Sequence, residues 1–461
     1  MPEFIHRLKP HSLIDNRTRT MSKSLNLLGL GTSAVLMSLS GSASADFFAD
    51  SKATLGLRNF YFNNDYRDQA GSAGQGKTEE WAQAFMLKYT SGYTDGTVGF
   101  GVDALGLLGI TLDSGPGRHL GSSMIPNDGD GAAGEWARLG LTAKVRFAKT
   151  EARVGTLQPK LPVLLSNDGR LLPQTFNGAM VTSNDIDNLT LTGGRINQAT
   201  SRGSSDRTGL AVSGGTRASN DFVFAGADYK VSKNLTLQYY AANLEDYYTQ
   251  QFFGLLNVLP LGDGQSLKTD LRYFDTRSSG ANDSASGRSQ GYKISGYTDD
   301  SNGKINNQTW SAIFTYSLGG HALTAGYQSV SSGSNFAQLN QGSITGKGAG
   351  GSSIYLFTDR LLASFNRAGE RTWFGQYAYD FAALGVPGLS ASMVYLKGDH
   401  IQTAAGQDQS EWERDAALDY VIQSGTFKGV GLGLRQGVFH SQADANQDQT
   451  RFIVSYSLDL L

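Results

Sequence analysis

Residues 451–461 read RFIVSYSLDLL, the segment that ends the chain. Its alternate positions are apolar: Phe452, Val454, Tyr456, Leu458 and Leu460. The positions between them begin with Arg451 and are polar except for Ile453. Successive side chains of a β-strand point to opposite faces. This stretch therefore predicts a strand with one apolar face and one polar face.

The same alternation recurs at 54–58, 97–104, 138–147 and 430–438. In a soluble β-sandwich, the apolar faces would pack against each other and the polar faces would meet water. In a transmembrane barrel, the apolar faces would meet lipid and the polar faces would line a lumen. The alternation alone is compatible with both architectures.

Two further features favour the barrel. Short turns alternate with long polar segments, as they do between the two ends of bacterial barrels. The short turns are 91–96, 231–234, 319–320 and 383–388, and the long segments are 63–79, 106–134, 277–306 and 331–370. Aromatic residues typical of membrane interfaces lie at strand ends: Tyr89, Tyr93, Tyr229, Tyr316 and Tyr420. Taking 331–370 as one loop, we count eighteen strands from Ala53 to Leu461 and predict an all-β fold, a single transmembrane antiparallel barrel.

The composition excludes several classes of protein. The chain of 461 residues has no Cys, so disulfides, Cys-ligated metals and thiol catalysis are excluded. Its formal charge of -2 argues against a general nucleic-acid binder, which needs a basic surface to neutralise phosphates. The six His show no spacing typical of a metal site, so we predict no metal and no cofactor.

The first part of the chain indicates export. From Met21 a short basic start is followed by an apolar stretch over 25–39 and by Ala43-Ser44-Ala45. This order is typical of a secretory signal peptide cut after Ala45, whereas a membrane anchor would need about 20 predominantly apolar residues. We therefore expect residues 1–20 to be an upstream extension, 21–45 a signal peptide and 46–461 a barrel domain in the bacterial outer membrane.

The polar faces predict a charged lumen. An eighteen-strand barrel filled only by wall side chains would leave an aqueous hole, so we expect residues 157–174, which are rich in Pro and Leu, to fold inward and narrow it. The basic residues with lumen parity are Arg58, Lys88, Arg138, Lys144, Arg146, Arg153, Lys268, Arg272, Arg435 and Arg451. The acids with the same parity are Asp103, Asp270, Asp415, Asp419 and Asp459. Each could be ordinary solvated wall charge, but guanidinium groups gathered in a narrow pore would attract carboxylates.

Several stretches resemble a known family. They are LRNFYFN (57–63), VGFGVDA (98–104), RLLPQT (170–175), YVIQSG (420–425) and LRQ (434–436). They occur in order along the chain and resemble the OprD-type outer-membrane carboxylate channels, most of all the branch that includes the BenF-like benzoate porins. The resemblance implies a monomeric eighteen-stranded barrel with an inward third loop, a long seventh loop and a ladder of basic side chains.

The same resemblance assigns roles to individual residues. Arg170 matches the arginine of the family's constriction, and Arg202 matches a basic residue of the fourth loop. Arg435 and Arg451 match ladder positions, and Arg67 lies near a first-loop ladder position. The chain departs from some relatives at Asn64 and Asp419, where those relatives carry a basic residue. The resemblance therefore does not extend to these two ladder positions, nor to the substrate preference of the relatives that have them.

The resulting functional hypothesis is passive uptake of aromatic monocarboxylates such as benzoate, with outer-membrane lipid around the barrel. Phe176, Tyr355 and Phe357 are candidate ring contacts, although they could instead pack loop against loop. A channel for basic amino acids or small peptides is the alternative. An outer-membrane hydrolase or an adhesin is a further alternative, and Gly287–Gly291 formally matches the G-x-S-x-G pattern of hydrolases.

Overall fold

The computed structural model describes residues 47–461 except 72–73, 120, 130 and 341–350. The expected upstream extension (1–20) and signal peptide (21–45) lie outside the described residues. No helix among the described residues is long and apolar enough to cross a membrane.

Eighteen strands form one sheet. Their bounds are β1 (Lys52–Tyr66), β2 (Lys77–Thr90), β3 (Val98–Asp113), β6 (Glu135–Phe147), β7 (Thr150–Leu157), β10 (Thr175–Ile186), β11 (Leu189–Thr200), β13 (Phe222–Lys230), β14 (Leu235–Leu244), β15 (Tyr248–Gly262), β16 (Gln265–Ser278), β17 (Asn306–Leu318), β18 (His321–Val330), β20 (Arg371–Asp380), β21 (Leu389–Thr403), β22 (Gly406–Val421), β23 (Gly431–Ser441) and β24 (Gln447–Asp459). Each strand pairs antiparallel with the next one in the chain, and β24 pairs with β1. The sheet is therefore a closed barrel, which confirms the predicted fold class and strand number.

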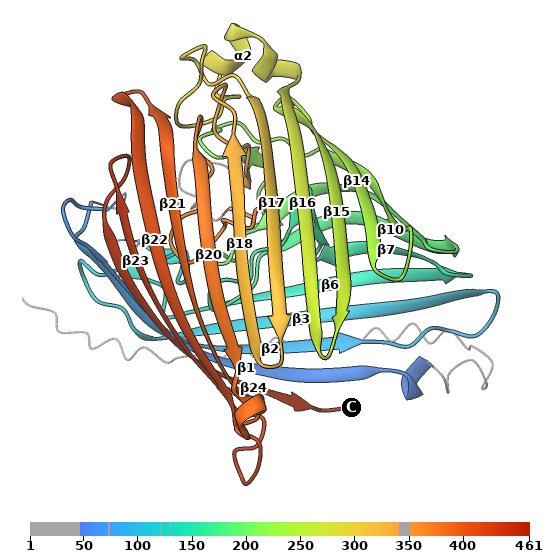
Figure 1. The fold of residues 1–461 in the computed structure, drawn as a ribbon. Helices are drawn as coiled ribbons and strands as arrows, with labels where there is room; N and C mark the ends of the chain where they lie inside the picture. Colours follow the sequence, from blue (N-terminus) through green and yellow to red (C-terminus); the bar gives the residue numbers. More distant parts are fainter. Residues whose placement is uncertain (1–46, 72–73, 120, 130, 341–350) are drawn as a thin grey trace, which may run out of the picture. The chain divides into compact units, whose positions relative to one another are not determined.

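The register of the closing pair joins Leu57 to Tyr456 and Arg58 to Ser455. Figure 1 shows β15 to β18 and β20 to β23 side by side along one wall, with β1, β2, β3 and β6 crossing behind them. A closed sheet leaves no free outer strand, so nearly all backbone groups of the wall find partners within it.

Short elements occupy the connections between the barrel strands. The two-residue strands are β4 (Asn127–Asp128), β5 (Gly131–Ala132), β8 (Lys160–Leu161), β9 (Leu164–Leu165), β12 (Ala211–Val212) and β19 (Leu339–Asn340). The helices are η1 (Gly280–Asp283), α2 (Ala285–Ser289) and η2 (Phe381–Leu384). Among them, the pairing of β12 with β19 joins the loop 201–221 to the loop 331–370.

Two of the expected long segments are shorter than the sequence suggested. The connection expected at 63–79 is only 67–76, because Asn63, Asn64 and Asp65 continue β1 and pair with β2. Likewise, β3 runs to Asp113 instead of ending near Gly106. Polar residues hid the extension of β1, since a ladder of backbone hydrogen bonds does not need apolar side chains. The extension of β3 is mostly apolar and was not recognised as a continuation of the strand.

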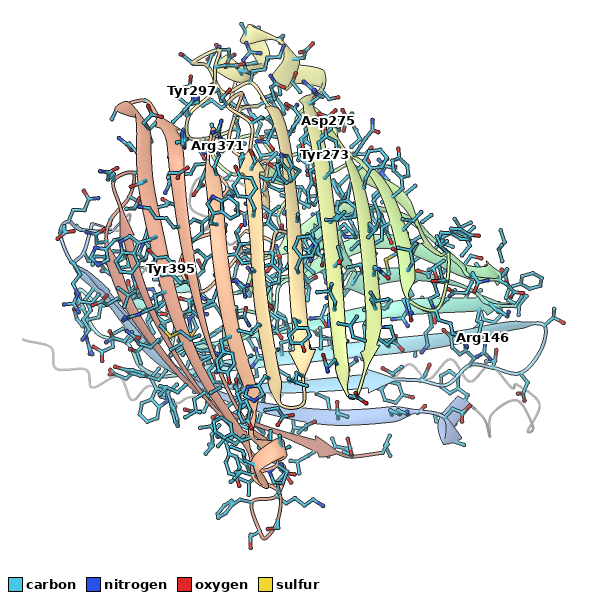
Figure 2. The ribbon with its side chains drawn as sticks, in the orientation of Figure 1. Arg146, Tyr273, Asp275, Tyr297, Arg371 and Tyr395 are labelled. Atoms are coloured by element: carbon cyan, nitrogen blue, oxygen red, sulfur yellow. The ribbon has the colours of Figure 1, made fainter. Side chains whose placement is uncertain are left out.

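The side chains are arranged as a membrane barrel requires. On β6, Leu139 and Leu141 are 66% and 56% exposed, whereas Lys144 is 3% exposed. The apolar face therefore points outward and the polar face inward, the reverse of a soluble sandwich. Aromatic residues join this outer face, including Tyr273 on β16 and Tyr395 on β21, both labelled in Figure 2.

The buried apolar clusters lie where loops fold against the inner wall. The loop 158–174, here called the third loop, follows β7 as predicted, and its Leu171 and Leu172 pack with Phe60 and Phe62 of β1. The loop 331–370, the seventh loop, places Phe365 against Phe374 and Phe439 of the wall. Both loops are thus held inside the barrel by hydrophobic burial.

Candidate functional site

A cavity of about 350 Å³ lies between the third loop and the inner wall. Four of the arginines singled out from the sequence line it: Arg58, Arg170, Arg435 and Arg451. Asp168 and Asp419 line the same cavity. The wall residues come from β1, β22, β23 and β24, so the closing seam of the barrel carries this site.

Arg170 is held in place by the burial of the two leucines that follow it. Leu171 and Leu172 are fully buried, which fixes the backbone of the third loop against β1. The Arg170 Nε atom donates to the carbonyl of Ser122 at 2.7 Å, and its Cζ atom lies 4.8 Å from the centre of the Phe62 ring. The guanidinium is thus oriented by neutral partners.

Arg451 approaches Phe62 as well. Its Cζ atom lies 5.7 Å from the ring centre. Its Nη2 atom donates to the carbonyl of Leu361 in the seventh loop at 2.6 Å, and Nε donates to Gln449 Oε1 at 2.6 Å. Arg451 therefore connects the wall to the seventh loop through neutral acceptors and forms no ion pair among the described contacts.

Arg202 completes the group from the loop 201–221, the fourth loop. Its Nη1 atom donates to Asn167 Oδ1 at 2.9 Å, and its buried Nε atom has no hydrogen-bond partner. Burial lowers the pKa of Arg202 to about 10. Burial also lowers the pKa of Arg170, and the positive charges of Arg451 and Arg202 lower it further. The three guanidinium groups, here called the arginine triad, therefore lie close enough to repel each other.

The triad, of which Arg170 and Arg451 line the cavity, contrasts with Arg58 and Arg435. Arg58 Nη1 donates to Asp168 Oδ1 at 2.8 Å, and Arg435 Nη2 donates to Asp419 Oδ1 at 2.6 Å. None of the ion pairs within the described part of the chain includes a member of the triad. Asp419 thus neutralises the neighbouring Arg435.

Other predicted ladder residues lie away from this cavity. Arg67 is half exposed and pairs with Asp448 and Asp65 near the long-loop end. Lys144, Arg146 and Arg153 line a separate cavity of about 400 Å³ beside the turn 91–97. Figure 2 shows Arg146 at the opposite end of the wall from Tyr297 and Arg371.

Most of these outlying basic residues have partners. Lys144 pairs with Asp103 at 2.7 Å, and Arg153 pairs with Glu151. The Arg146 guanidinium lies over the Tyr93 ring, 4.3 Å from its centre.

Two more ladder candidates hold the loops in place. Arg138 donates to the carbonyls of Ser201 and Pro173, each at 2.8 Å. Arg272 pairs with Asp270 at 2.7 Å and donates to the carbonyl of Tyr355 at 3.0 Å. Both arginines therefore fix loops to the wall through these hydrogen bonds.

The three candidate ring contacts all pack within the protein. Phe176 is fully buried in a cluster with Leu157 and Leu164. Tyr355 lies under the Arg272 guanidinium at 3.9 Å, and Phe357 stacks on Phe374 with 4.7 Å between ring centres. These contacts are the ones expected if the rings pack the loops within the protein instead of contacting a substrate.

Two charged residues of the site were not identified from the sequence. Arg360 in the seventh loop lies over Phe357 at 4.2 Å, and its buried Nε and Nη2 atoms have no hydrogen-bond partner. Asp359 beside it is buried, which raises its pKa, while Arg202 acts in the opposite direction. The seventh loop has no alternating pattern, so the sequence offered no sign of which of its residues face inward.

The G-x-S-x-G pattern at Gly287–Gly291 does not lie in the structural environment that a nucleophilic Ser needs. Ser289 lies in the short helix α2, and its Oγ atom donates to the carbonyl of Ala285 at 2.9 Å. A nucleophilic Ser needs a strand-to-helix turn and a base within hydrogen-bond reach. The described contacts of Ser289 supply neither.

Comparison with known proteins agrees with this geometry. Residues 45–460 match the family described as outer membrane porin, OprD family. The crystal structure of OccK8 (OprE) from Pseudomonas aeruginosa is 49% identical, covers 90% of this chain and 100% of its own, and has a TM-score of 0.82. A BenF-like porin from Pseudomonas fluorescens Pf-5 is 36% identical over the same shares, with a TM-score of 0.78.

A third solved structure contains an aromatic acid. OpdK from Pseudomonas aeruginosa, solved with vanillate, is 34% identical, covers 90% of this chain and 100% of its own, and has a TM-score of 0.78. Together with the closed barrel of eighteen strands, these matches establish that the chain belongs to the OprD family of outer membrane porins.

Proposed function

We propose that this porin takes up small aromatic monocarboxylates, such as benzoate, by passive diffusion past the arginine triad. The observation that carries the proposal is that Arg170, Arg202 and Arg451 are oriented by neutral oxygen atoms and form no ion pair among the described residues. A substrate carboxylate would supply the missing negative charge, and a guanidinium can bind it through two parallel hydrogen bonds.

Weak binding is part of the proposed mechanism. Each triad arginine already donates to an oxygen of the protein, so an anion gains charge compensation without being the only hydrogen-bond partner. A channel conducts only if a site that attracts its substrate also releases it. The concentration gradient supplies the driving force, with no cofactor and no covalent chemistry.

Two related structures support an aromatic acid in particular. OpdK was solved with vanillate, which is an aromatic carboxylate, and another neighbour is a BenF-like porin. In this chain, Tyr355 and Phe357 are partly exposed beside arginines of the seventh loop and the wall, and they remain our candidates for ring contacts. Phe176, the third candidate, is fully buried and instead holds the third loop against the wall.

One observation favours a second candidate, a channel for basic amino acids or small peptides. Asp168 and Asp419 line the same cavity as the arginines, so the cavity offers carboxylates to a substrate amine as well. Both acids already form ion pairs, with Arg58 and Arg435, whereas no triad arginine forms an ion pair among the described residues. Because the acids are paired and the triad arginines are not, we favour a monocarboxylate over a basic substrate.

Competition in single-channel recordings separates the two candidates. We expect benzoate on one side of a planar bilayer to carry current or to interrupt the chloride current, and arginine at equal concentration to have a smaller effect. The reverse order, with arginine more effective than benzoate, would favour the basic amino-acid channel.

We further propose that residues 21–45 direct export and are removed after Ala45, and that the mature protein works as a single barrel. One chain closes the barrel by itself, through the pairing of β1 with β24. N-terminal sequencing of protein purified from outer membranes should begin at Asp46, and a different first residue would refute the proposed cleavage site.

A further inference from the structure

The barrel wall is incomplete on one side of β6. This strand pairs with β3 along its whole length, from Glu135 to Phe147. On its other side it pairs with β7 only from Thr142 to Phe147. Within the described structure, Glu135–Leu141 therefore has a strand neighbour on one side only.

The inward third loop is the cause of this gap. At Gly155 the backbone has a φ of +135°, and a Cβ atom there would overlap the carbonyl of Leu141. The Thr142 hydroxyl donates to the carbonyl of Thr156 at 2.6 Å, just before the chain leaves the wall after Leu157. Because the chain then turns into the lumen, no strand continues beside the rest of β6.

A cavity of about 200 Å³ lies at the gap. Its lining includes Leu139, which is 66% exposed on the lipid-facing side, and Gly140, which is buried on the inner side. Thr156, Thr175 and Asn177 face them from β7 and β10. The cavity is therefore bordered by residues of both faces of the wall.

The inner side of this cavity is closed by Arg138. Its two terminal nitrogens donate to Ser201 and Pro173, where the fourth loop begins and the third loop ends. Its buried Nε atom has no hydrogen-bond partner. Arg138 thus bridges the two loops on the lumen side of the cavity, while Leu139 lies on its lipid-facing side.

The exposed edge determines what can occupy the gap. Backbone groups at membrane depth need polar partners, because lipid chains offer none. Arg207 of the fourth loop lines the same cavity and is exposed, and none of the described hydrogen bonds or ion pairs includes its guanidinium. An acceptor-rich anionic group at the edge, joined to an apolar chain over Leu139, satisfies both requirements.

We propose that this gap is a binding site for a lipid of the surrounding membrane that carries a phosphate headgroup. The phosphate accepts hydrogen bonds from Arg207 and from the free edge of β6, and an acyl chain covers Ala137 and Leu139. Basic pockets at membrane interfaces recognise anionic headgroups in this way. The site lies outside the conduction path and is independent of the substrate proposed above.

The chain has no Cys, so a single reporter can be placed at the gap. Ser205 is exposed and lines the cavity, and we would label Ser205→Cys with a bimane fluorophore. The probes are phosphatidic acid and phosphatidylcholine with the same brominated acyl chains, mixed into detergent micelles. We expect the phosphatidic acid to quench the label at a lower mole fraction than the phosphatidylcholine.

Substitution of the headgroup contact provides the decisive comparison. Arg207→Ala should raise the mole fraction of phosphatidic acid needed for half quenching about fivefold, as expected for one basic residue beside an anionic lipid. Arg217→Ala, which removes another exposed arginine of the fourth loop, should leave it unchanged. Heat-modifiable mobility in electrophoresis confirms that each variant is folded.

Two results would overturn the proposal. Equal quenching by both lipids, unchanged in Arg207→Ala, would mean that membrane lipid contacts the gap without recognition of its headgroup. Quenching by neither lipid, together with disulfide-linked dimers of unlabelled Ser205→Cys, would mean that a second copy of the chain covers the gap.

Discussion

At the scale of single residues, we propose that selectivity depends on which arginines form no ion pair with an acid. Arg58 and Arg435 are paired with aspartates, whereas Arg170 and Arg451 are oriented by carbonyl or amide oxygens. A charge compensated by a neighbouring carboxylate contributes little to the potential that a passing anion meets. In our proposal, the triad therefore attracts anions more strongly than the paired arginines Arg58 and Arg435 do.

This difference predicts the effect of removing one triad charge. Arg170→Ala should lower the anion-to-cation permeability ratio about fivefold, which corresponds to the ~1 kcal/mol that one unit charge contributes at about 4 Å in water. Reversal potentials in a salt gradient measure the ratio. The matched control is Arg67→Ala, because Arg67 is paired with Asp448 and lies outside the cavity. Equal effects of both substitutions would remove Arg170 from the mechanism.

At the scale of elements, the sequence predicted the barrel strands and the third loop but not which residues of the seventh loop face inward. Alternation predicted the strands because one face must be apolar for lipid and the other polar for the lumen, as on β6 with Leu139 and Lys144. The inward third loop was predicted from its unusual content of Leu and Pro. Arg360 and Asp359 were missed because the seventh loop is aperiodic, and its packing depends on contacts with distant strands such as β20 and β23.

The third loop itself allows a test of how the constriction is held. Leu171→Ala should cost about 2–5 kcal/mol of the packing that fixes this loop to β1, since it leaves a cavity beside Phe60 and Phe62. We expect a larger and noisier single-channel conductance with weaker anion preference. Leu139→Ala, on the lipid-facing side of β6, is the control and should leave the conductance unchanged. A quiet, unchanged current in folded Leu171→Ala would show that this anchor does not set the constriction.

At the scale of the whole molecule, the barrel wall and the loops folded inside it have different roles. Apart from the free edge of β6, the closed sheet satisfies backbone hydrogen bonds in the membrane, and the loops that fold inward supply Arg170, Arg202 and the carbonyl that orients Arg451. The sequence and the family resemblance together identified the triad residues. Their common lack of an ion pair emerged only from the fold, because it depends on which acids the closure of the barrel places beside which arginines.

If the unpaired arginines of the triad make this porin select anions, the reversal potential of the wild-type mature protein in a potassium chloride gradient will show it. We expect a potential of the sign set by chloride, in a channel of small conductance, and a further shift when benzoate replaces part of the chloride. A potential near zero or of the opposite sign, in a channel of large conductance, would contradict it, since the triad would then act only as wall charge beside an open pore.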